Sequence, residues 1–302
     1  MEEDLNGFRQ RLEGHLPNLT KSQQRIASYL LASYDEAAFL HAADLAQRLN
    51  VSEATIVRFA RAVGYDGFRE LHHCLQGLFR AKATPASRLQ RKLGELAGSQ
   101  GHVLTKVLDM EVQYLTEAAH SIDPADFDRA VDILLSGQRI FVFGSGPSGI
   151  LADLAELRLR RLGILTIAMT ESGRHLLEKL QLLQPGDVAL ATGFQYVRPE
   201  LVTVLDHARA TGCPSILLTD TLGHALRGKP DVILAARRGP VSTFHSLTVP
   251  MSILNALILA VAMARPEESL AALNRLQQLR ATSGLDVLTK VPARLLQLES
   301  NL

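Results

Sequence analysis

Hydrophobic residues in the first 80 positions recur at the spacing of amphipathic helices, and no stretch there alternates as a half-buried strand would. Ile26 and Leu30 would share one face of the first such helix, and Leu45 and Ala46 would lie inward on the second. Three helices are predicted, at Lys21 to Ser33, His41 to Leu49 and Ser52 to Ala62. This part of the chain is therefore predicted to be an all-α bundle.

Beyond Arg139 the pattern changes to short, continuous apolar runs separated by helical stretches. The runs are Ile140 to Phe143, Ile164 to Ala168, Val188 to Thr192, Ser215 to Thr219 and Val232 to Ala235. Continuous apolar character indicates strands covered on both faces, and helices between them imply parallel crossover connections. We expect an α/β domain with a doubly wound, parallel, five-stranded sheet, covered in part by an apolar helix from Thr248 to Ala264.

A polar and basic connector separates these two parts. Arg80 to Lys106 holds six Lys or Arg residues against one Glu, a net charge of +5. Helices are predicted around Ser87 to Leu96 and near Val103 to Ala119. The expected organisation is 1–80 as a helical domain, 81–120 as the connector, 121–265 as the sheet domain and 266–302 as a leucine-rich helical tail.

The overall composition narrows the class of protein. With 302 residues, 47% of them hydrophobic, the chain can form two domains with their own cores, and a net charge of +1 gives no general attraction to nucleic acid or membrane. Cys74 and Cys213 lack ligand spacing, so neither a metal site nor a disulfide framework is expected. Residues 1–4 are acidic rather than signal-like, and Thr248 to Ala264 is short for a membrane span, so we expect a cytoplasmic protein without membrane contact.

The helical part contains a helix-turn-helix pattern. Ala46 is the small residue that lets two helices approach, Asn50 can adopt the left-handed turn conformation, and Ile56 seals the inner side. Polar side chains on the outer face of the second helix could reach bases or phosphates in a major groove. These candidate DNA-binding residues are Ser52, Glu53, Thr55, Arg58 and Arg61. A generic three-helix bundle with solvated arginines fits the same pattern.

The net charge of the helical part limits the affinity that a single copy could have for DNA. Residues 1–79 contain eight Lys or Arg and ten acidic residues, a net charge of −2. A single module with few cationic contacts should bind double-stranded DNA weakly. A dimer that reads two half-sites is therefore expected, with the basic connector beside the phosphate backbone.

A glycine-rich loop follows the first predicted strand. It reads Gly144-Ser145-Gly146-Pro147-Ser148-Gly149 and leads into a helix, with Pro147 suited to the first helical position. Glycines let the backbone approach an anion, a helix N-terminus attracts it, and two serines add hydroxyl donors. A dinucleotide site fits as well, because Glu171 follows the second strand at a suitable distance, and so does a tight turn without a ligand.

These motifs, in this order, resemble those of a known family. Thr20 to Leu71, with Val51-Ser52-Glu53-Ala54-Thr55-Ile56-Val57-Arg58-Phe59 and Gly64-Tyr65-Asp66-Gly67-Phe68, resembles the N-terminal domain of RpiR-type bacterial transcriptional regulators. Phe127 to Ala264 resembles a sugar isomerase (SIS) domain, with its glycine-serine loop at Gly144 to Ser148. The resemblance implies a homodimeric or homotetrameric regulator whose SIS domain binds a phosphorylated sugar and alters DNA binding without catalysis.

The chain departs from that family at the loop after the third strand. SIS domains usually carry Ser-x-Ser-Gly-x-Thr there, whereas this chain reads Leu190-Ala191-Thr192-Gly193-Phe194-Gln195. Thr192 keeps one hydroxyl, Gln195 can donate an amide hydrogen, and Arg198 and Tyr196 follow. Arg198 could bind phosphate or carboxylate, or it could be a surface charge. The effector could therefore be a sugar phosphate, a sugar acid or a non-phosphorylated ligand.

The resulting set of candidate effector-binding residues comes from three segments of the sheet domain. The set is Gly144, Ser145, Gly146, Ser148, Thr192, Gln195, Arg198 and His245. His245 precedes the long apolar helix, where a capping segment is an equally good interpretation. A sugar-phosphate isomerase is the catalytic alternative, with Glu171, Glu200 or His245 as the base. With a helix-turn-helix in front, we expect neither catalysis nor a cofactor.

Overall fold

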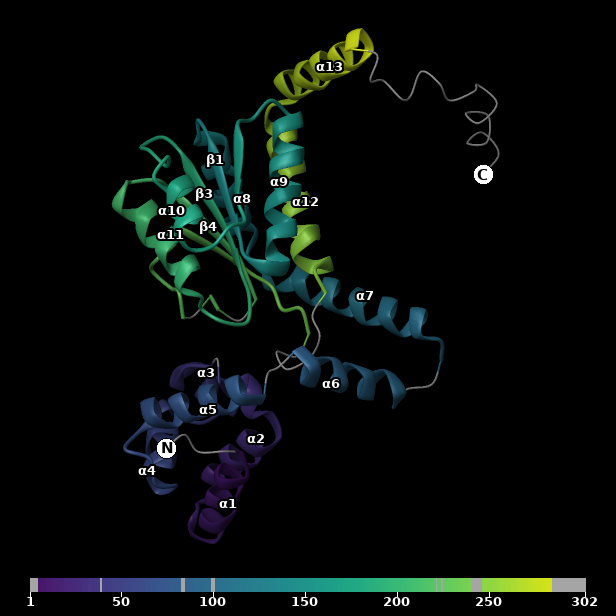
Figure 1. Cartoon of the computed structure of the whole chain (residues 1–302). Coiled ribbons are helices and arrows are strands. Elements are labelled where there is room, and N and C mark those ends of the chain that lie inside the picture. The colour runs from purple at the N-terminus through teal and green to yellow at the C-terminus, as the bar shows by residue number, and fades with distance from the viewer. Residues whose placement is uncertain are drawn as a thin grey trace.

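The computed structural model describes residues 5–38, 40–82, 85–98, 101–220, 222–223, 225–239 and 246–283. A helical bundle at the N-terminus lies below a sheet domain, and two connector helices join them (Figure 1). Each part has buried hydrophobic residues of its own, with one cluster in the bundle and one on each face of the sheet. The predicted two-domain architecture is confirmed.

The bundle consists of helices whose apolar faces meet in one core. Its elements are α1 (Leu5–His15), the short 3-10 helix η1 (Leu16–Asn18), α2 (Lys21–Ala37), α3 (Ala42–Arg48), α4 (Glu53–Ala62) and α5 (Phe68–Lys82). Thr20 caps α2 in a capping box with Gln23. The three predicted helices are present, but α2 continues four residues past Ser33, because the non-helical dihedral angles of that residue kink the helix without ending it.

The turn between α3 and α4 has the geometry that the helix-turn-helix pattern predicts. Asn50 takes a left-handed φ of 49°, and the amide of Val51 donates to the carbonyl of Ala46 at 2.9 Å, which closes the end of α3. Arg25 of α2 donates to the carbonyls of Leu49 and Asn50. The crossing of α3 and α4 is therefore held by both the turn and the neighbouring helix.

The connector forms a helical hairpin that projects from the sheet domain (Figure 1). It consists of α6 (Pro85–Ala97) and α7 (Val103–Ser121). Lys106 of α7 donates to the carbonyl of Leu96 at 2.5 Å, and Lys92 of α6 contacts the sulfur of Met110 at 3.7 Å. The end of α7 enters the sheet domain, where Ala118 is buried.

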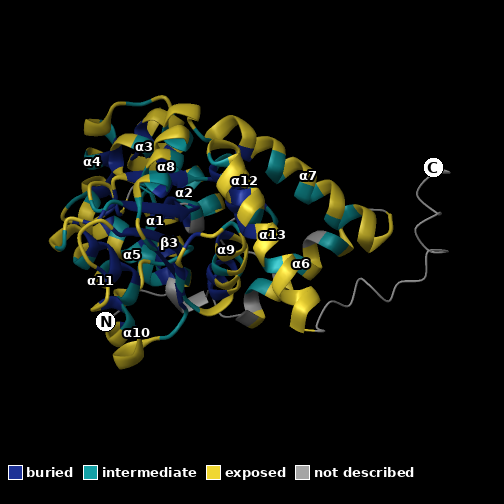
Figure 2. Ribbon diagram, turned by 90° about the horizontal axis from the view of Figure 1, so that it is seen from above, coloured by how far each residue is buried: buried dark blue, intermediate teal, exposed yellow. Residues whose placement is uncertain are grey.

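The sheet has five parallel strands in the order β2-β1-β3-β4-β5. They are β1 (Ile140–Gly144), β2 (Thr166–Met169), β3 (Val188–Gly193), β4 (Ser215–Thr219) and β5 (Val232–Ala235). The helices are α8 (Pro124–Ser136), α9 (Gly149–Arg161), α10 (Gly173–Leu180), α11 (Pro199–Ala210), α12 (Thr248–Ala264) and α13 (Pro266–Ser283). Two clusters on opposite faces, one with α8, α9 and α12 and one with α10 and α11, bury the strands (Figure 2).

In the sheet domain, the starts of two elements differ by two residues from their predicted positions. The second strand starts at Thr166 rather than Ile164, because the Ile164 amide donates to the carbonyl of Leu159 and Gly163 turns the chain with a φ of 82°, which ends α9. Helix α9 starts at Gly149, since Pro147 belongs to a separate 3-10 turn, η2 (Gly146–Ser148).

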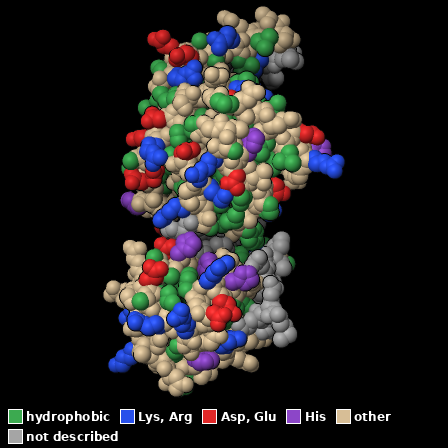
Figure 3. All heavy atoms as spheres, turned by 90° about the vertical axis from the view of Figure 1, so that its left-hand side faces the viewer, with side chains coloured by type: hydrophobic (Ala, Val, Ile, Leu, Met, Phe, Trp, Pro, Cys, Tyr) green, Lys and Arg blue, Asp and Glu red, His purple; other side chains and the backbone are tan. Residues whose placement is uncertain are grey.

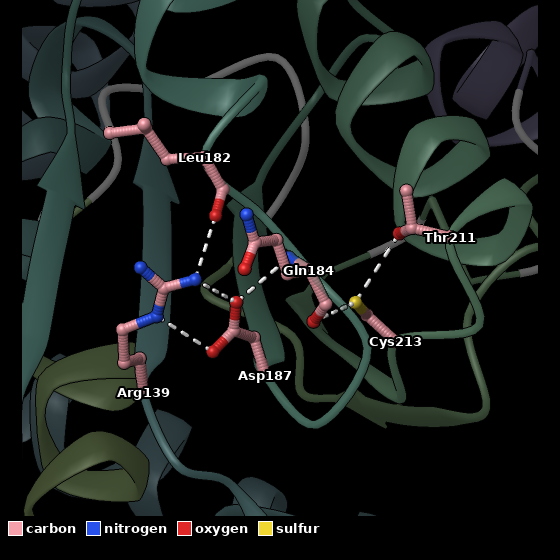
Figure 4. A network of polar contacts seen from close by, with 6 residues as sticks. All are labelled: Arg139, Leu182, Gln184, Asp187, Thr211 and Cys213. Carbon is pink, nitrogen blue, oxygen red and sulfur yellow. Dashed lines mark hydrogen bonds and ion pairs between the residues drawn. The ribbon is translucent and has the colours of Figure 1, made fainter.

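A buried carboxylate ties the amino-terminal ends of β1 and β3 together. Asp187 accepts from Nε and Nη2 of Arg139 at 2.9 and 2.6 Å, and from the amide of Gln184 at 2.8 Å (Figure 4). The Asp187 hydrogen bonds raise the pKa of Arg139 above its usual value. This network is structural, because it lies at the opposite ends of the strands from the loops predicted to bind the effector.

The apolar helix α12 lies in the core, as predicted. Within the described part of the chain, no single helix meets the length and hydropathy of a membrane span; α12 and α13 meet them only as a pair, and that pair is bent by 103°. In α13, Ser269 and Ala272 are buried, whereas Leu270 and Leu279 are exposed.

Candidate effector pocket and DNA-binding face

Both predicted effector loops lie at the point where the order of the sheet reverses. Strands β1 and β3 are neighbours, with Gly144 paired to Thr192 at their carboxyl ends, and the chain leaves β1 toward β2 and β3 toward β4. Ligands of open α/β sheets bind in the crevice at such a switch point. The topology therefore brings together two loops that are 48 positions apart at these residues.

The first loop needs glycine at its start. A Cβ at Gly144 would lie 2.3 Å from the carbonyl oxygen of Ser148 and 2.9 Å from Oγ1 of Thr192. The amides of Ser148 and Gly149 donate to carbonyls within the turn. Three features of the loop can still interact with an anion: the positive end of α9 and the hydroxyls of Ser145 and Ser148. In the described part of the chain, these two hydroxyls have no hydrogen-bond partner.

The second loop is held by internal hydrogen bonds. The Thr192 hydroxyl donates to the carbonyl of Phe143 at 2.9 Å, so its proton serves the sheet rather than a ligand. Gln195 takes a left-handed φ of 69°, and its backbone N–H donates to Oδ1 of Asp220 at 3.2 Å. Its side-chain oxygen accepts from Arg88 of α6. The prediction assigned Gln195 a donor role, whereas the structure also uses it as an acceptor.

A cavity of about 450 Å³ separates the two loops and extends to the connector. Its lining includes Ser145, Ser148, Thr192, Gln195 and Arg198 of the predicted set. Gly144 and Gly146 belong to the loop but do not line the cavity, and His245 lies outside the described residues. Three arginines line it, Arg88, Arg198 and Arg238, and no described lining residue carries a carboxylate.

Sequence reasoning missed the most deeply buried of these arginines. Arg238 is 6% exposed, donates to Oδ2 of Asp220 at 3.0 Å and to the carbonyl of Ser246 at 3.3 Å, and lies 4.0 Å from the ring centre of Phe194. Burial lowers its pKa, although the Asp220 carboxylate opposes that shift. The available signal was a charged pair, Arg237-Arg238, at the carboxyl end of β5.

Sequence reasoning also missed the connector residue in the pocket. The guanidinium of Arg88 lies 5.2 Å from the ring centre of Tyr196, which in turn lies 6.1 Å from that of Phe79 in α5. Tyr196 thus packs against the bundle and the connector. Arg198, by contrast, is exposed at the cavity and begins α11 as its N-cap. No pattern within one segment predicts contacts that join α5, α6 and the β3 loop.

The two glutamates considered for dinucleotide binding or catalysis lie elsewhere. Glu171 forms an ion pair with Lys179 at 2.6 Å and accepts from the amide of Thr170 at 3.0 Å. The bonds from Lys179 and the backbone outweigh its desolvation and lower its pKa. Neither Glu171 nor Glu200 lines the cavity. The described geometry therefore offers no carboxylate base facing this pocket.

The predicted DNA-binding residues lie along α4. Ser52 caps the helix by accepting from the amide of Thr55 at 3.2 Å, and Arg58 donates to the Thr55 hydroxyl at 3.3 Å. Arg61 donates to the carbonyl of Asp66 at 3.2 Å. Ser52, Glu53, Arg58 and Arg61 are exposed, and Thr55 is half-buried.

The surroundings of α4 suit contact with another molecule. Figure 1 shows α4 at the end of the bundle away from the sheet domain. On the face drawn in Figure 3, basic and acidic side chains are intermixed over both domains. On this face, attraction to a polyanion would therefore come from individual arginines rather than from one large basic patch.

In a comparison with known protein families, the helical domain and the sheet domain each match a family. Residues 6–82 match the helix-turn-helix domain of the rpiR family, and residues 133–260 match the SIS domain. An uncharacterized HTH-type transcriptional regulator from Haemophilus influenzae is 26% identical over 217 residues, covering 72% of this chain and 75% of that protein. Three further curated relatives are longer: at 31% identity over 204 residues, this chain spans 31% of each.

Solved structures show the same fold. The sugar isomerase domain of an RpiR transcription factor from Sphaerobacter thermophilus is 25% identical with a TM-score of 0.56, covering 59% of this chain and 99% of that one. The Vibrio vulnificus NanR protein, complexed with ManNAc-6P, is 20% identical with a TM-score of 0.59, covering 91% and 98%. With the helix-turn-helix and SIS domains in this order, the chain belongs to the RpiR-type transcriptional regulators.

Proposed function

We propose that this regulator binds an operator in double-stranded DNA through Ser52, Glu53, Thr55, Arg58 and Arg61, and that an anionic metabolite controls this binding. The metabolite would be a sugar phosphate or a sugar acid. The observation that carries the proposal is the cavity at the β1–β3 switch point, where the glycine-serine loop faces three arginines. NanR, which has a similar fold, is complexed with ManNAc-6P.

In this proposal the phosphate lies at the first loop and the rest of the ligand reaches the second. Ser145 and Ser148 donate hydroxyl hydrogens, Gly144 and Gly146 let the backbone turn closely around the anion, and the positive end of α9 attracts it. Gln195 and Arg198 would contact the ligand from the second loop, and His245 would contact it from the segment before α12. The ligand can shift DNA binding only if it favours one arrangement of the bundle over another.

The oligomeric state, catalysis and location follow from the same proposal. Few cations on α4 and a bundle of net negative charge favour a homodimer or homotetramer that reads two half-sites. A cavity whose described lining lacks a carboxylate base supports sensing rather than isomerisation. We place the protein in the cytoplasm, with the DNA, and keep the division into 1–80, 81–120, 121–265 and 266–302.

The DNA-binding role is tested with Arg58→Ala. DNA selected from a random pool by the wild-type chain serves as the probe, and fluorescence anisotropy at one fixed salt concentration gives the affinity. Loss of one base or phosphate contact by an exposed guanidinium should weaken binding about ten- to hundredfold. Arg9→Ala, an exposed arginine on α1, is the matched control and should bind as the wild type does.

Two results would contradict the assignment. One is a selection that enriches no DNA sequence under any condition in which the chain is folded. The other is equal affinity of the wild type and Arg58→Ala for the selected DNA.

A further inference from the structure

We propose that two copies of this chain form a homodimer by exchanging their connector hairpins, so that the arm of each copy lies on the sheet domain of the other. The arm is the hairpin of α6 and α7, and the surface that receives it, the α9–α12 face, is the outer side of those two helices. This inference rests on the homo-oligomer of the proposed function, because it assigns the surfaces through which that oligomer would form.

The arm exposes apolar side chains along its length. In α7, Leu104, Leu108 and Val112 recur every four residues and therefore lie along one side of the helix. Contiguous exposed apolar surface of this kind marks an interaction site. Of the seventeen large hydrophobic side chains that are exposed in the described part of the chain, six belong to the arm: Leu89, Leu93, Val103, Leu104, Leu108 and Val112.

A second exposed apolar surface lies on the sheet domain. Leu259 and Met263 of α12 are 64% and 80% exposed, although the opposite side of the same helix lies in the core. Ile150 and Leu157 of α9, two turns apart, are exposed as well. Because α9 and α12 cover the same side of the sheet, these four side chains belong to one outer face of the domain (Figure 1).

A second copy of this chain can cover both surfaces at once. The arm projects beyond α9 and α12 in both ribbon views (Figures 1 and 2). Because α7 is one continuous helix whose end is buried at Ala118, the arm cannot turn back onto the α9–α12 face of its own chain. A copy related by a two-fold axis presents its face to the arm and its arm to the face, which closes the assembly at two chains.

The exposed charges of the two surfaces are complementary. Exposed carboxylates on α7 belong to Asp109 and Glu117, and the helix holds one lysine against three acidic residues. The last turn of α9 carries Arg158, Arg160 and Arg161, all of them exposed. An arm that lies across the partner's α9 would bring these opposite charges together, which favours the exchanged pairing and sets its register.

The exchange would also restrict the positions of the two DNA-binding bundles. Helix α6 of the arm follows α5 of the bundle in the chain, so an arm that is held by the partner limits where its own bundle can lie. A dimer that reads two half-sites needs such a restriction, because the spacing of the recognition helices must match the spacing of the half-sites.

Sedimentation velocity of the full chain without DNA tests the exchange. The wild type should be a dimer in the micromolar range. One double variant changes the arm, Leu104→Glu with Leu108→Glu, and another changes the face, Leu259→Glu with Met263→Glu. Each should raise the dissociation constant of the dimer at least about a hundredfold, because every added charge is buried twice in a symmetric dimer.

A third double variant is the matched control. Leu177→Glu with Leu182→Glu adds the same charge at exposed leucines in and just after α10, which covers the opposite side of the sheet. This variant should dimerise as the wild type does. Far-UV circular dichroism checks that all three double variants are folded, which their exposed positions favour.

Mixing the arm variant with the face variant identifies the exchange itself. Their heterodimer keeps one intact contact, between the unchanged arm of one chain and the unchanged face of the other. The mixture should therefore associate about tenfold or more tightly than either variant alone, because the two contacts are separate in space. If arms paired with arms instead, the face variant alone would dimerise as the wild type does.

The possible failures are distinct. A wild-type chain that stays monomeric throughout the micromolar range overturns the exchange together with the proposed homo-oligomer, and leaves the effector pocket and the DNA-binding residues standing. A dimer that either double variant leaves intact, or two impaired variants that gain nothing on mixing, overturns the exchange alone.

Discussion

Single residues of the effector pocket are constrained by steric contact as much as by chemistry. Gly144 has no room for a methyl group, because the carbonyl of Ser148 turns back over it at the end of β1. Gly146, two positions later, has open space around it but a left-handed φ of 59°. The loop therefore needs glycine at both positions for different reasons: close backbone approach at the first and a rare backbone conformation at the second.

We expect Gly144→Ala to destabilise the sheet domain more than Gly146→Ala. A Cβ 2.3 Å from a backbone oxygen forces the loop to move, which should cost about 2 to 3 kcal/mol of unfolding free energy. The left-handed alanine at position 146 should cost about 1 kcal/mol. Urea unfolding of the two variants measures the difference, and equal losses would argue against the close approach at Gly144.

At the scale of the element, the bundle places a half-buried histidine, His72, against the helix-turn-helix. The ring of His72 in α5 stacks on Phe68 at 5.5 Å and lies 6.1 Å from that of His41, which precedes α3. Burial lowers the pKa of His72 below its ordinary value of 6.5, and the nearby His41 lowers it further. The folded bundle therefore favours the neutral imidazole more than the unfolded chain does.

The bundle should lose stability in acid. Because the folded pKa of His72 is depressed, its contribution is present above about pH 6.5 and is lost as the pH falls through the lowered pKa. Thermal unfolding followed by circular dichroism should show a smaller drop in Tm between neutral and mildly acidic pH for His72→Gln than for the wild type. The exposed His73→Gln is the control, and an unchanged acid dependence in His72→Gln would contradict this role.

At the scale of the whole molecule, the two domains have separate cores and a small set of shared contacts. The bundle core includes Phe79, and from the sheet domain Tyr196 packs against it. Arg88 of the connector touches the same tyrosine and Gln195. Domains with their own cores and a small contact surface usually unfold as separate units.

Differential scanning calorimetry should therefore resolve two transitions. Lowering the pH toward 5.5 should lower the midpoint temperature of the bundle transition, because His72 becomes protonated more readily in the unfolded bundle. A bound hexose 6-phosphate should raise the midpoint temperature of the sheet-domain transition only, since a ligand stabilises the unit that binds it. Tyr196→Ala should bring the bundle transition closer to that of the isolated bundle. A single cooperative transition that responds to both changes would show that the domains unfold together.

Much of this protein was determined by local sequence. Periodic apolar positions predicted the bundle helices, and continuous apolar runs predicted the five strands of a parallel sheet, because both patterns depend on residues close in the chain. Asn50 and Gly144 predicted the turns in which they lie, and this prediction was also local. A left-handed or crowded backbone limits the residue type at that one position.

The composition of the pocket was decided by tertiary structure alone. Arg88 comes from the connector and Arg238 from the segment after β5, and neither has a local pattern that points toward the glycine-serine loop. They meet because the strand order places β1 beside β3 and because α6 returns along the β3 loop. Contacts of this kind depend on how distant segments pack, so they cannot be predicted from the spacing of residues along the chain.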